Sequence, residues 1–199
     1  MKTGVDACPT CGLTYVRGSP DDESEHRRRH RLWAAVAEPK PSPAVRKLNA
    51  TDGLIAVDWR SRPWLNKAVY ERAKLFRREF GYDFVQWYEL GPGREFEPDF
   101  RARAFLFIAD DNAIIAGACA FRWRAWTKAP HEWAMDWVWL APRFRRRGIL
   151  TRHWPTFTAL FGSGFYLEPP LSDAMEAFAR KRGHLRTSGR TVMPPGVAT

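Results

Sequence analysis

The pattern of apolar and polar residues predicts alternating helices and strands from residue 53 onward. In residues 62–81 apolar side chains recur every three or four positions, so we predict an amphipathic helix that Gly81 terminates. Residues 103–123 hold two apolar runs joined by the polar residues 110–112, a pattern typical of a β-hairpin. The apolar positions of the helix are Leu65, Ala68, Val69, Ala73, Phe76 and Phe80.

Alternation of side chains is clearest in residues 131–142, which predicts a strand. We expect its tryptophan-rich face to pack on helices, while the opposite face carries two carboxylates. Further strands are expected at residues 53–59 and 164–168, and further helices at about 148–161 and 171–183. The tryptophan-rich face consists of Trp133, Met135, Trp137 and Trp139, and the opposite face of Glu132, Ala134, Asp136, Val138 and Leu140.

The first thirty residues carry the ligand spacing of a zinc finger. Two residues separate Cys8 from Cys11, fourteen separate Cys11 from His26, and His30 follows one helical turn later. Zinc takes four nitrogen or sulfur ligands in a tetrahedron, and a Cys-x-x-Cys turn facing two histidines on a helix supplies them. We therefore predict a structural Zn²⁺ bound by Cys8, Cys11, His26 and His30. Chelation should unfold this module.

The composition divides the chain into a small and a large part. Residues 1–36 are predicted to form the finger, residues 37–52 a Pro-rich polar linker, and residues 53–199 one larger domain. With 45% hydrophobic and 14% aromatic residues, the chain can build a substantial core. Its apolar runs are too short for a membrane span or a signal peptide, so we expect no membrane partner. The expected location is the cytoplasm, with nucleoid or nuclear association as an alternative.

The formal net charge of +10 indicates an anionic partner. Four arginines fall within the five positions from Arg143 to Arg147, directly before Gly148. This tract either grips nucleic acid or wraps a phosphate before a helix begins. The arginines beside the finger histidines are expected to form a solvated face, and Cys119 is expected to be a buried strand residue.

The sequence "LAPRFRRRGIL" at the end of the fourth predicted strand of this domain resembles the GNAT superfamily of acyl-CoA N-acyltransferases. In that family a strand runs into an Arg/Gln-x-x-Gly-x-Gly/Ala loop and then a helix, and Arg145 and Gly148 fill the first two key positions. The resemblance implies an α/β (α+β) fold with a mixed sheet flanked by helices, and loop amides that bind the pyrophosphate of acetyl-CoA. It assigns cofactor binding to Val138, Trp139, Leu140, Arg143, Arg145, Arg146, Arg147, Gly148, Ile149 and Leu150.

A finger placed ahead of such a domain resembles the sister-chromatid cohesion acetyltransferases, which acetylate lysines on a cohesin subunit. This resemblance implies that the chain transfers an acetyl group to an amine, with a protein lysine as the expected acceptor. The finger then has a structural or docking role. The matching finger positions are Cys8, Cys11, Gly12, Tyr15, Pro20, Asp22, His26 and His30.

Acetyl transfer to an amine needs a base and a donor that polarises the thioester carbonyl. Asp136 and Glu132 are our candidates for the base, because they lie on the acidic face of one predicted strand. By resemblance, Asp173 in "EPPLSDAMEAF" corresponds to the catalytic aspartate of a "DPTPDG" motif. Its alternative role is that of a favourable charge in the first turn of a helix. A strand amide near residues 138–140 is the expected carbonyl donor.

Two other functions stay open from the sequence. The chain could be a nucleic-acid-binding zinc-finger protein with a degenerate GNAT domain, in which case its binding falls steeply with salt. It could also acetylate a small-molecule amine. Acetyl transfer and nucleic-acid binding could also be combined. The acceptor would then be a chromosome-associated protein bound to DNA.

Overall fold

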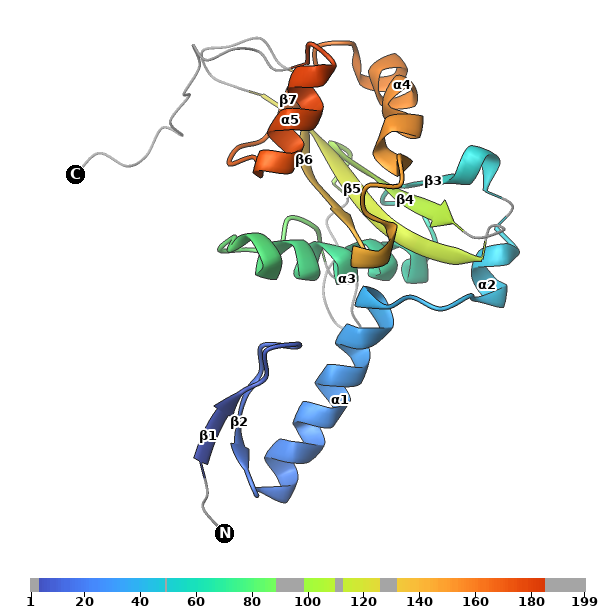
Figure 1. The fold of residues 1–199 in the computed structure, drawn as a ribbon. Coiled ribbons are helices and arrows are strands. Elements are labelled where there is room, and N and C mark those ends of the chain that lie inside the picture. Colours follow the sequence, from blue (N-terminus) through green and yellow to red (C-terminus); the bar gives the residue numbers. More distant parts are fainter. Residues whose placement is uncertain (1–3, 49, 89–98, 110–112, 126–131, 185–199) are drawn as a thin grey trace, which may run out of the picture.

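The structure is a computed structural model of the 199-residue chain, and it describes residues 4–48, 50–88, 99–109, 113–125 and 132–184. The polar turn predicted at residues 110–112 lies outside these ranges. Figure 1 shows a small unit, made of a hairpin and a long helix, next to a larger unit in which helices flank a sheet. Among the described residues no helix is both long and apolar enough to span a membrane.

Two strands and one helix build the small unit. β1 (Gly4–Ala7) pairs antiparallel with β2 (Thr14–Arg17), and α1 (Pro20–Ala37) packs along β2. Ser19 caps the helix, because its hydroxyl oxygen accepts a hydrogen bond from a first-turn amide at 3.4 Å. Pro20 occupies the first helical position, where its missing N–H is not needed. The cap therefore fixes where the helix starts relative to the hairpin.

The segment that follows α1 packs on the larger unit. The sequence predicts a polar linker at residues 37–52, whereas Val45 in the short helix α2 (Pro43–Arg46) is only 4% exposed. The amide of Ser42 donates a hydrogen bond to the carbonyl oxygen of Ala113 at 2.8 Å. Apolar residues among the prolines and lysines thus anchor this stretch to the core.

One five-stranded sheet forms the centre of the larger unit, in the order β3-β4-β5-β6-β7. All neighbouring strands are antiparallel except β6 and β7, which run parallel, so the mixed sheet flanked by helices is confirmed. The strands are β3 (Leu54–Val57), β4 (Ala102–Ala109), β5 (Ile114–Arg124), β6 (Glu132–Leu140) and β7 (Tyr166–Leu167). The helical segments are η1 (Thr51–Gly53), α3 (Pro63–Phe80), η2 (Pro142–Phe144), α4 (Ile149–Phe161) and α5 (Asp173–Lys181).

The helices α3 and α4 cover opposite faces of this sheet (Figure 1). On the α4 face, the rings of Phe157 and Phe161 lie 5.1 and 4.1 Å from that of Phe121, centroid to centroid. On the α3 face, Phe76 lies 5.9 Å from Trp137. Burial of these aromatic side chains from both sides makes the sheet the core of the molecule.

The prediction that four alternate side chains of β6 share one face is wrong. Trp137 and Trp139 do face α3, where the indole N–H of Trp139 donates to Glu79 at 3.0 Å. Trp133 instead faces α4, with its ring 4.9 Å from that of Phe161. The tryptophan-rich stripe is therefore divided between the two faces.

A β-bulge at Asp136 causes this division. In the ladder between β5 and β6, Ala120 lies opposite Trp137 and the next residue, Phe121, lies opposite Met135. Asp136 is the extra residue on β6. A slip of one residue moves every side chain beyond it to the other face of a sheet. The residues of β6 before Asp136 therefore exchange faces relative to the simple alternation.

Gly117 is required where β5 passes close to the end of β6. A Cβ at this position would overlap the carbonyl oxygen of Trp139 and lie 2.9 Å from the Cα of Leu140. We predict that Gly117→Ala lowers the free energy of unfolding by about 2 kcal/mol, because backbone atoms cannot move aside as a side chain can. Denaturant titration followed by circular dichroism measures it. Gly4→Ala is the control, since a Cβ there meets nothing within 4 Å. Equal stability of the two variants would contradict this account of β5.

Candidate active site and metal centre

The four predicted zinc ligands converge at the top of the finger. Their ligand atoms all lie within 4.8 Å of one another, and Cys8 Sγ lies 3.5 Å from His30 Nδ1. The ring of Tyr15 stacks on His26 at 4.1 Å, and His26 Nε2 is buried without a hydrogen-bond partner in the described structure. A buried ring nitrogen left without a partner beside two thiols is what a bound metal would satisfy. The residues Cys8, Cys11, His26 and His30 therefore fit a structural Zn²⁺.

The turn between the two cysteines favours the thiolate of Cys8, the form that binds zinc, whereas burial raises the pKa of Cys11. The backbone amide of Cys11 points at Cys8 Sγ at 3.4 Å. This amide and the neighbouring histidines outweigh the effect of burial and lower the pKa of Cys8 to about 5. In contrast, burial raises the pKa of the Cys119 thiol, which lies fully enclosed in β5. Cys119 is thus a structural residue, as the sequence indicates.

The arginine tract lies in the loop between β6 and α4. Gly148 is the N-cap of α4 and has a φ of +74°, and Arg146 has a φ of +59°. Residues with positive φ turn successive amides toward one side, which is how a chain builds an anion-binding nest. A Cβ on Gly148 would meet nothing within 4 Å, so the space beside the helix start is open. The first-turn amides of α4, among them those of Ile149 and Leu150, can therefore reach a phosphate.

The arginines of this loop fall into two groups, those that hold the loop in place and those that are available to an anion. Arg145 forms a two-bond ion pair with Glu79, at 2.7 and 2.6 Å, and its Nε donates to the carbonyl oxygen of Leu140 at 2.8 Å. Arg143 donates to the carbonyl oxygen of Pro39 at 2.6 Å. These two side chains are committed to holding the loop. Arg146 and Arg147, whose side chains are exposed, are the ones placed to attract an anion from solvent.

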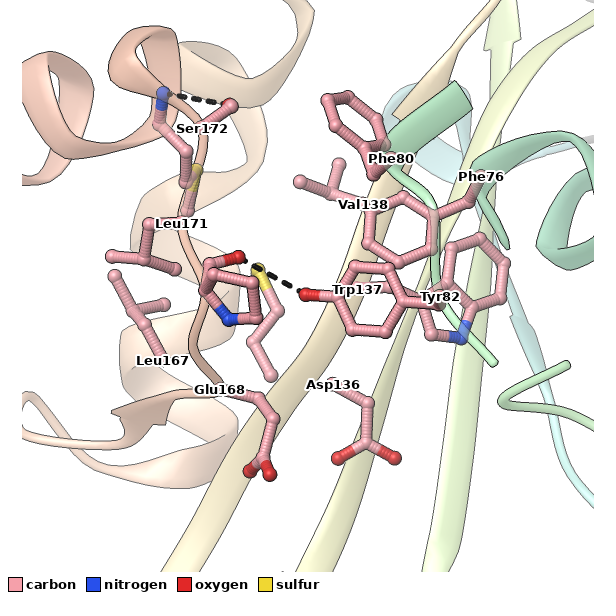
Figure 2. Close-up of a pocket in the computed structure, with 13 residues that line it drawn as sticks. Phe76, Phe80, Tyr82, Asp136, Trp137, Val138, Leu167, Glu168, Leu171 and Ser172 are labelled. Atoms are coloured by element: carbon pink, nitrogen blue, oxygen red, sulfur yellow. Dashed lines mark hydrogen bonds between the residues drawn. The ribbon is translucent and has the colours of Figure 1, made fainter. Parts of the chain in front are cut away.

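A pocket opens where β6 and β7 separate. The two strands pair only at Ala134 with Tyr166 and at Met135 with Leu167, so beyond Met135 the β7 side of β6 has no strand partner among the described residues. The pocket, including the part that is open to solvent, has a volume of about 410 Å³. Figure 2 shows its walls, with side chains of α3 and β6 on one side facing those of the segment after β7. The lining residues are Phe76, Phe80, Tyr82, Met135, Asp136, Trp137, Val138, Leu167, Glu168, Pro170, Leu171, Ser172 and Met175.

Tyr82 ties the two walls of this pocket together. Its hydroxyl donates a hydrogen bond to the carbonyl oxygen of Pro170 at 3.0 Å (Figure 2). Burial raises the pKa of this phenol, and the nearby Glu168 raises it further. The hydroxyl therefore stays protonated at neutral pH and can keep donating this bond.

Two carboxylates lie at one end of the pocket, Asp136 from β6 and Glu168 from the residue directly after β7 (Figure 2). Asp136 is only 3% exposed and is held by Arg122 Nε at 3.1 Å and by Arg124 at 2.8 Å. Burial raises the pKa of Asp136, and the two guanidinium groups oppose that rise. Asp136 is therefore an ion-paired carboxylate rather than a free one.

Glu168 has the more available carboxylate. Its Oε2 is buried and has no hydrogen-bond partner in the described structure, while the guanidinium of Arg124 lies 3.6 Å away. Burial raises the pKa of Glu168, Arg124 lowers it, and the charge of Asp136 raises it further. A half-buried carboxylate with a raised pKa, next to a pocket, has the properties of a general base.

These groups belong to one continuous network of ion pairs. Arg122 also forms an ion pair with Asp99, so the order is Asp99, Arg122, Asp136, Arg124, Glu168. Three carboxylates thus face two guanidinium groups. Two of the three carboxylates, Asp136 and Glu168, line the pocket.

The other predicted catalytic residues do not line the pocket. Glu132 is the first residue of β6, opposite Arg124 in the ladder, and Asp173 is exposed at the first position of α5. Among the predicted cofactor residues, Val138 does line the pocket. The sequence analysis missed Glu168. The available signal was an acid placed directly after a short strand and before two prolines, where the chain must leave the sheet.

Two family models match the chain. Residues 1–32 match the zinc finger of acetyl-transferase ESCO, and residues 62–154 match the acetyltransferase (GNAT) family. The second match covers α3 through the first half of α4, which includes β6 and the arginine loop. Comparison with curated protein sequences gives no match.

Several solved structures are similar to the chain at low identity. The xEco2 acetyltransferase domain bound to a K105–CoA conjugate is 15% identical, with 64% of this chain and 85% of that chain covered and a TM-score of 0.44. A ribosomal-protein-alanine N-acetyltransferase from Brucella melitensis biovar Abortus 2308 is 12% identical, with 71% and 96% covered and a TM-score of 0.45. A putative acetyl transferase from Pyrococcus furiosus is 13% identical, with 71% and 99% covered and a TM-score of 0.44. The assignment of the chain rests on the two family models.

We predict that the purified chain binds one Zn²⁺ and that Cys11→Ser loses most of it, because a hydroxyl is a poor zinc ligand. Elemental analysis of the purified protein measures the metal content. Cys119→Ala is the matched control and should keep its zinc, since this thiol is enclosed in β5 far from the finger in sequence. An unchanged zinc content in Cys11→Ser would overturn the ligand set.

Proposed function

Because the chain joins an ESCO-type zinc finger to a GNAT acetyltransferase domain, we propose that the acetyl group it transfers from acetyl-CoA goes to a lysine amine of a protein. The observation that carries this proposal is the pocket between β6 and β7. It has the half-buried carboxylate of Glu168 at one end, and the open amides of the α4 start lie near the other end of β6. The finger is proposed to stabilise the chain and to help dock the acceptor.

The geometry supports a binding mode in which the loop holds the diphosphate of acetyl-CoA and the pocket holds its thioester end. The amides after Gly148 would bind the diphosphate, and the exposed Arg146 and Arg147 would add positive charge beside it. The thioester end would lie along β6 beyond Met135, where the strand edge has no partner among the residues described. A β6 amide between Val138 and Leu140 remains the proposed donor to the thioester carbonyl.

Glu168 is our proposed general base. A lysine amine is protonated at neutral pH and must lose a proton before its nitrogen can attack a carbonyl carbon. Glu168 would take that proton, either directly or through one water. Once the amine nitrogen bonds to the carbonyl carbon, the carbon–sulfur bond breaks and the thiolate leaves and takes up a proton. Asp136, held between two arginines, would fix the position of Arg124 beside Glu168.

The charges of the described residues favour a cationic acceptor over nucleic acid. The surplus carboxylate at the pocket attracts an ammonium group and repels a phosphate. On the finger helix, Arg27 pairs with Glu23, and Arg28 and Arg29 both pair with Glu25, so two acids of the same helix partly offset the charge of three arginines. This supports the expectation that the arginines beside the histidines form a solvated face.

Acceptor identity is open to a direct experiment. The zinc-loaded chain is incubated with isotope-labelled acetyl-CoA and a lysate, and mass spectrometry locates the label. The proposal expects labelled lysines in a small set of proteins. Label only on small amines would favour small-molecule acetylation, and failure to bind acetyl-CoA in a calorimetric titration would reject the enzyme assignment altogether.

We predict that Glu168→Gln lowers kcat by about 100-fold or more, because general base catalysis is typically worth that much. The dissociation constant for acetyl-CoA should stay within about twofold, since the thioester does not depend on the base for binding. Initial rates with a labelled lysine peptide from the previous experiment measure the change. Glu176→Gln, an exposed acid on α5, is the matched control. Equal rates in the two variants would remove Glu168 from the mechanism.

The pH profile should follow the ionisation of Glu168. Its pKa is raised, so kcat/KM falls as pH decreases through that raised value and the carboxylate becomes protonated. Arg124 lowers this pKa, so Arg124→Met should shift the acidic limb of the profile to higher pH. Arg101→Met, on the exposed surface before β4, should leave the limb in place. An acidic limb that is the same in Arg124→Met would show that a different group controls it.

A further inference from the structure

The finger and the sheet unit meet at the last turn of α3. Arg78 reaches into the turn between the zinc ligands, where its guanidinium donates to the carbonyl oxygens of Thr10 at 2.5 Å and Pro9 at 3.1 Å. The same group lies 5.1 Å above the ring of Trp33 in α1. Figure 1 shows α3 lying between the finger and the sheet, which is the arrangement that lets one side chain touch both.

Gly12 makes room for this contact. A Cβ at Gly12 would lie 2.9 Å from the guanidinium carbon of Arg78, and the glycine has a φ of +68°. The guanidinium thus makes two hydrogen bonds to the Cys-x-x-Cys turn and one contact with the ring face of Trp33. The position of those two carbonyl oxygens depends on the turn that brings Cys8 and Cys11 together on the metal.

The next residue along α3 holds the phosphate-binding loop. Glu79 forms the two-bond ion pair with Arg145 and accepts the indole N–H of Trp139 at 3.0 Å. Arg145 in turn donates to the carbonyl oxygen of Leu140, at the strand end where the loop begins. Two-bond guanidinium–carboxylate pairs fix geometry better than ordinary surface ion pairs do. Consecutive residues of one helical turn therefore grip the zinc turn and the loop that precedes Gly148.

We propose that Arg78 and Glu79 are positioning residues that couple the zinc turn to the cofactor loop, so that zinc in the finger strengthens binding of acetyl-CoA. None of the zinc ligands lines the pocket, so the ion acts through this helix turn. With the metal bound, the carbonyl oxygens of Pro9 and Thr10 hold Arg78, and the end of α3 presents Glu79 to Arg145. With the metal removed, that turn loses its fixed shape and Arg78 loses its acceptors. The inference rests on the proposed binding of acetyl-CoA by the loop.

The test uses the full chain and CoA itself as the probe, measured by isothermal titration calorimetry. Removing zinc from the wild type with a chelator should weaken CoA binding by about fivefold or more, within the usual range of coupling between sites. Coupling is reciprocal, so saturating CoA should strengthen zinc binding by the same factor in a chelator competition. Circular dichroism and tryptophan emission check that the sheet unit stays folded.

Variants separate this coupling from simple loss of the finger. Arg78→Met keeps the aliphatic stem and removes the donors, so zinc-loaded Arg78→Met should bind CoA more weakly and respond less to zinc removal. Lys74→Met, one turn earlier on the same helix with the same change of charge, is the control and should behave as the wild type. Hydrogen exchange by mass spectrometry should show faster exchange in residues 141–150 of Arg78→Met and of zinc-free wild type than in zinc-loaded wild type.

The outcomes distinguish this inference from the function on which it rests. If zinc-loaded wild type binds CoA and neither zinc removal nor Arg78→Met changes that affinity, the coupling is wrong and the function stands. If zinc-loaded wild type does not bind CoA at all, both are overturned. A weaker CoA affinity in Lys74→Met equal to that in Arg78→Met would also overturn it, because general charge rather than the contact with the zinc turn would then be responsible.

Discussion

The bulge at Asp136 is the feature on which the rest of the site depends. It turns the second half of β6 so that Trp137 and Trp139 face α3 while Trp133 faces α4. Pairing with β7 ends one residue earlier, at Met135, so the strand edge beyond it is left for a ligand. An extra residue in one strand thus separates two strands, places a carboxylate between two arginines and opens the pocket beside it.

In the proposed function the arginine tract serves a phosphate-binding loop, and its four side chains divide into two groups. Arg143 and Arg145 are bound by protein oxygens, whereas Arg146 and Arg147 remain exposed next to the open start of α4. This division shows why net charge alone could not choose between a nucleic-acid partner and a phosphate-bearing cofactor. Arg143 and Arg145 hold the loop in the shape in which its amides would bind a phosphate. The exposed arginines add a screened, long-range attraction.

Local spacing made the finger predictable. Two cysteines on one turn and two histidines on one face of a helix can be recognised without knowledge of the rest of the chain. Periodicity predicted the helices and strands for the same reason, whereas the mixed sheet was implied by the resemblance to the GNAT superfamily. The bulge did not, because register depends on which residue of β5 lies opposite each residue of β6. Glu168 escaped notice for a related reason. Its importance comes from the divergence of β7 from β6 and from Arg124 on a third strand, and neither is visible in the residues around it.

A crystal structure of the full chain with zinc and CoA would test the central claim most directly. The account predicts the diphosphate on the amides that follow Gly148 and the thiol end between β6 and β7, within reach of Glu168. Electron density for CoA elsewhere on the surface, with the space beyond Met135 closed by side chains, would contradict it.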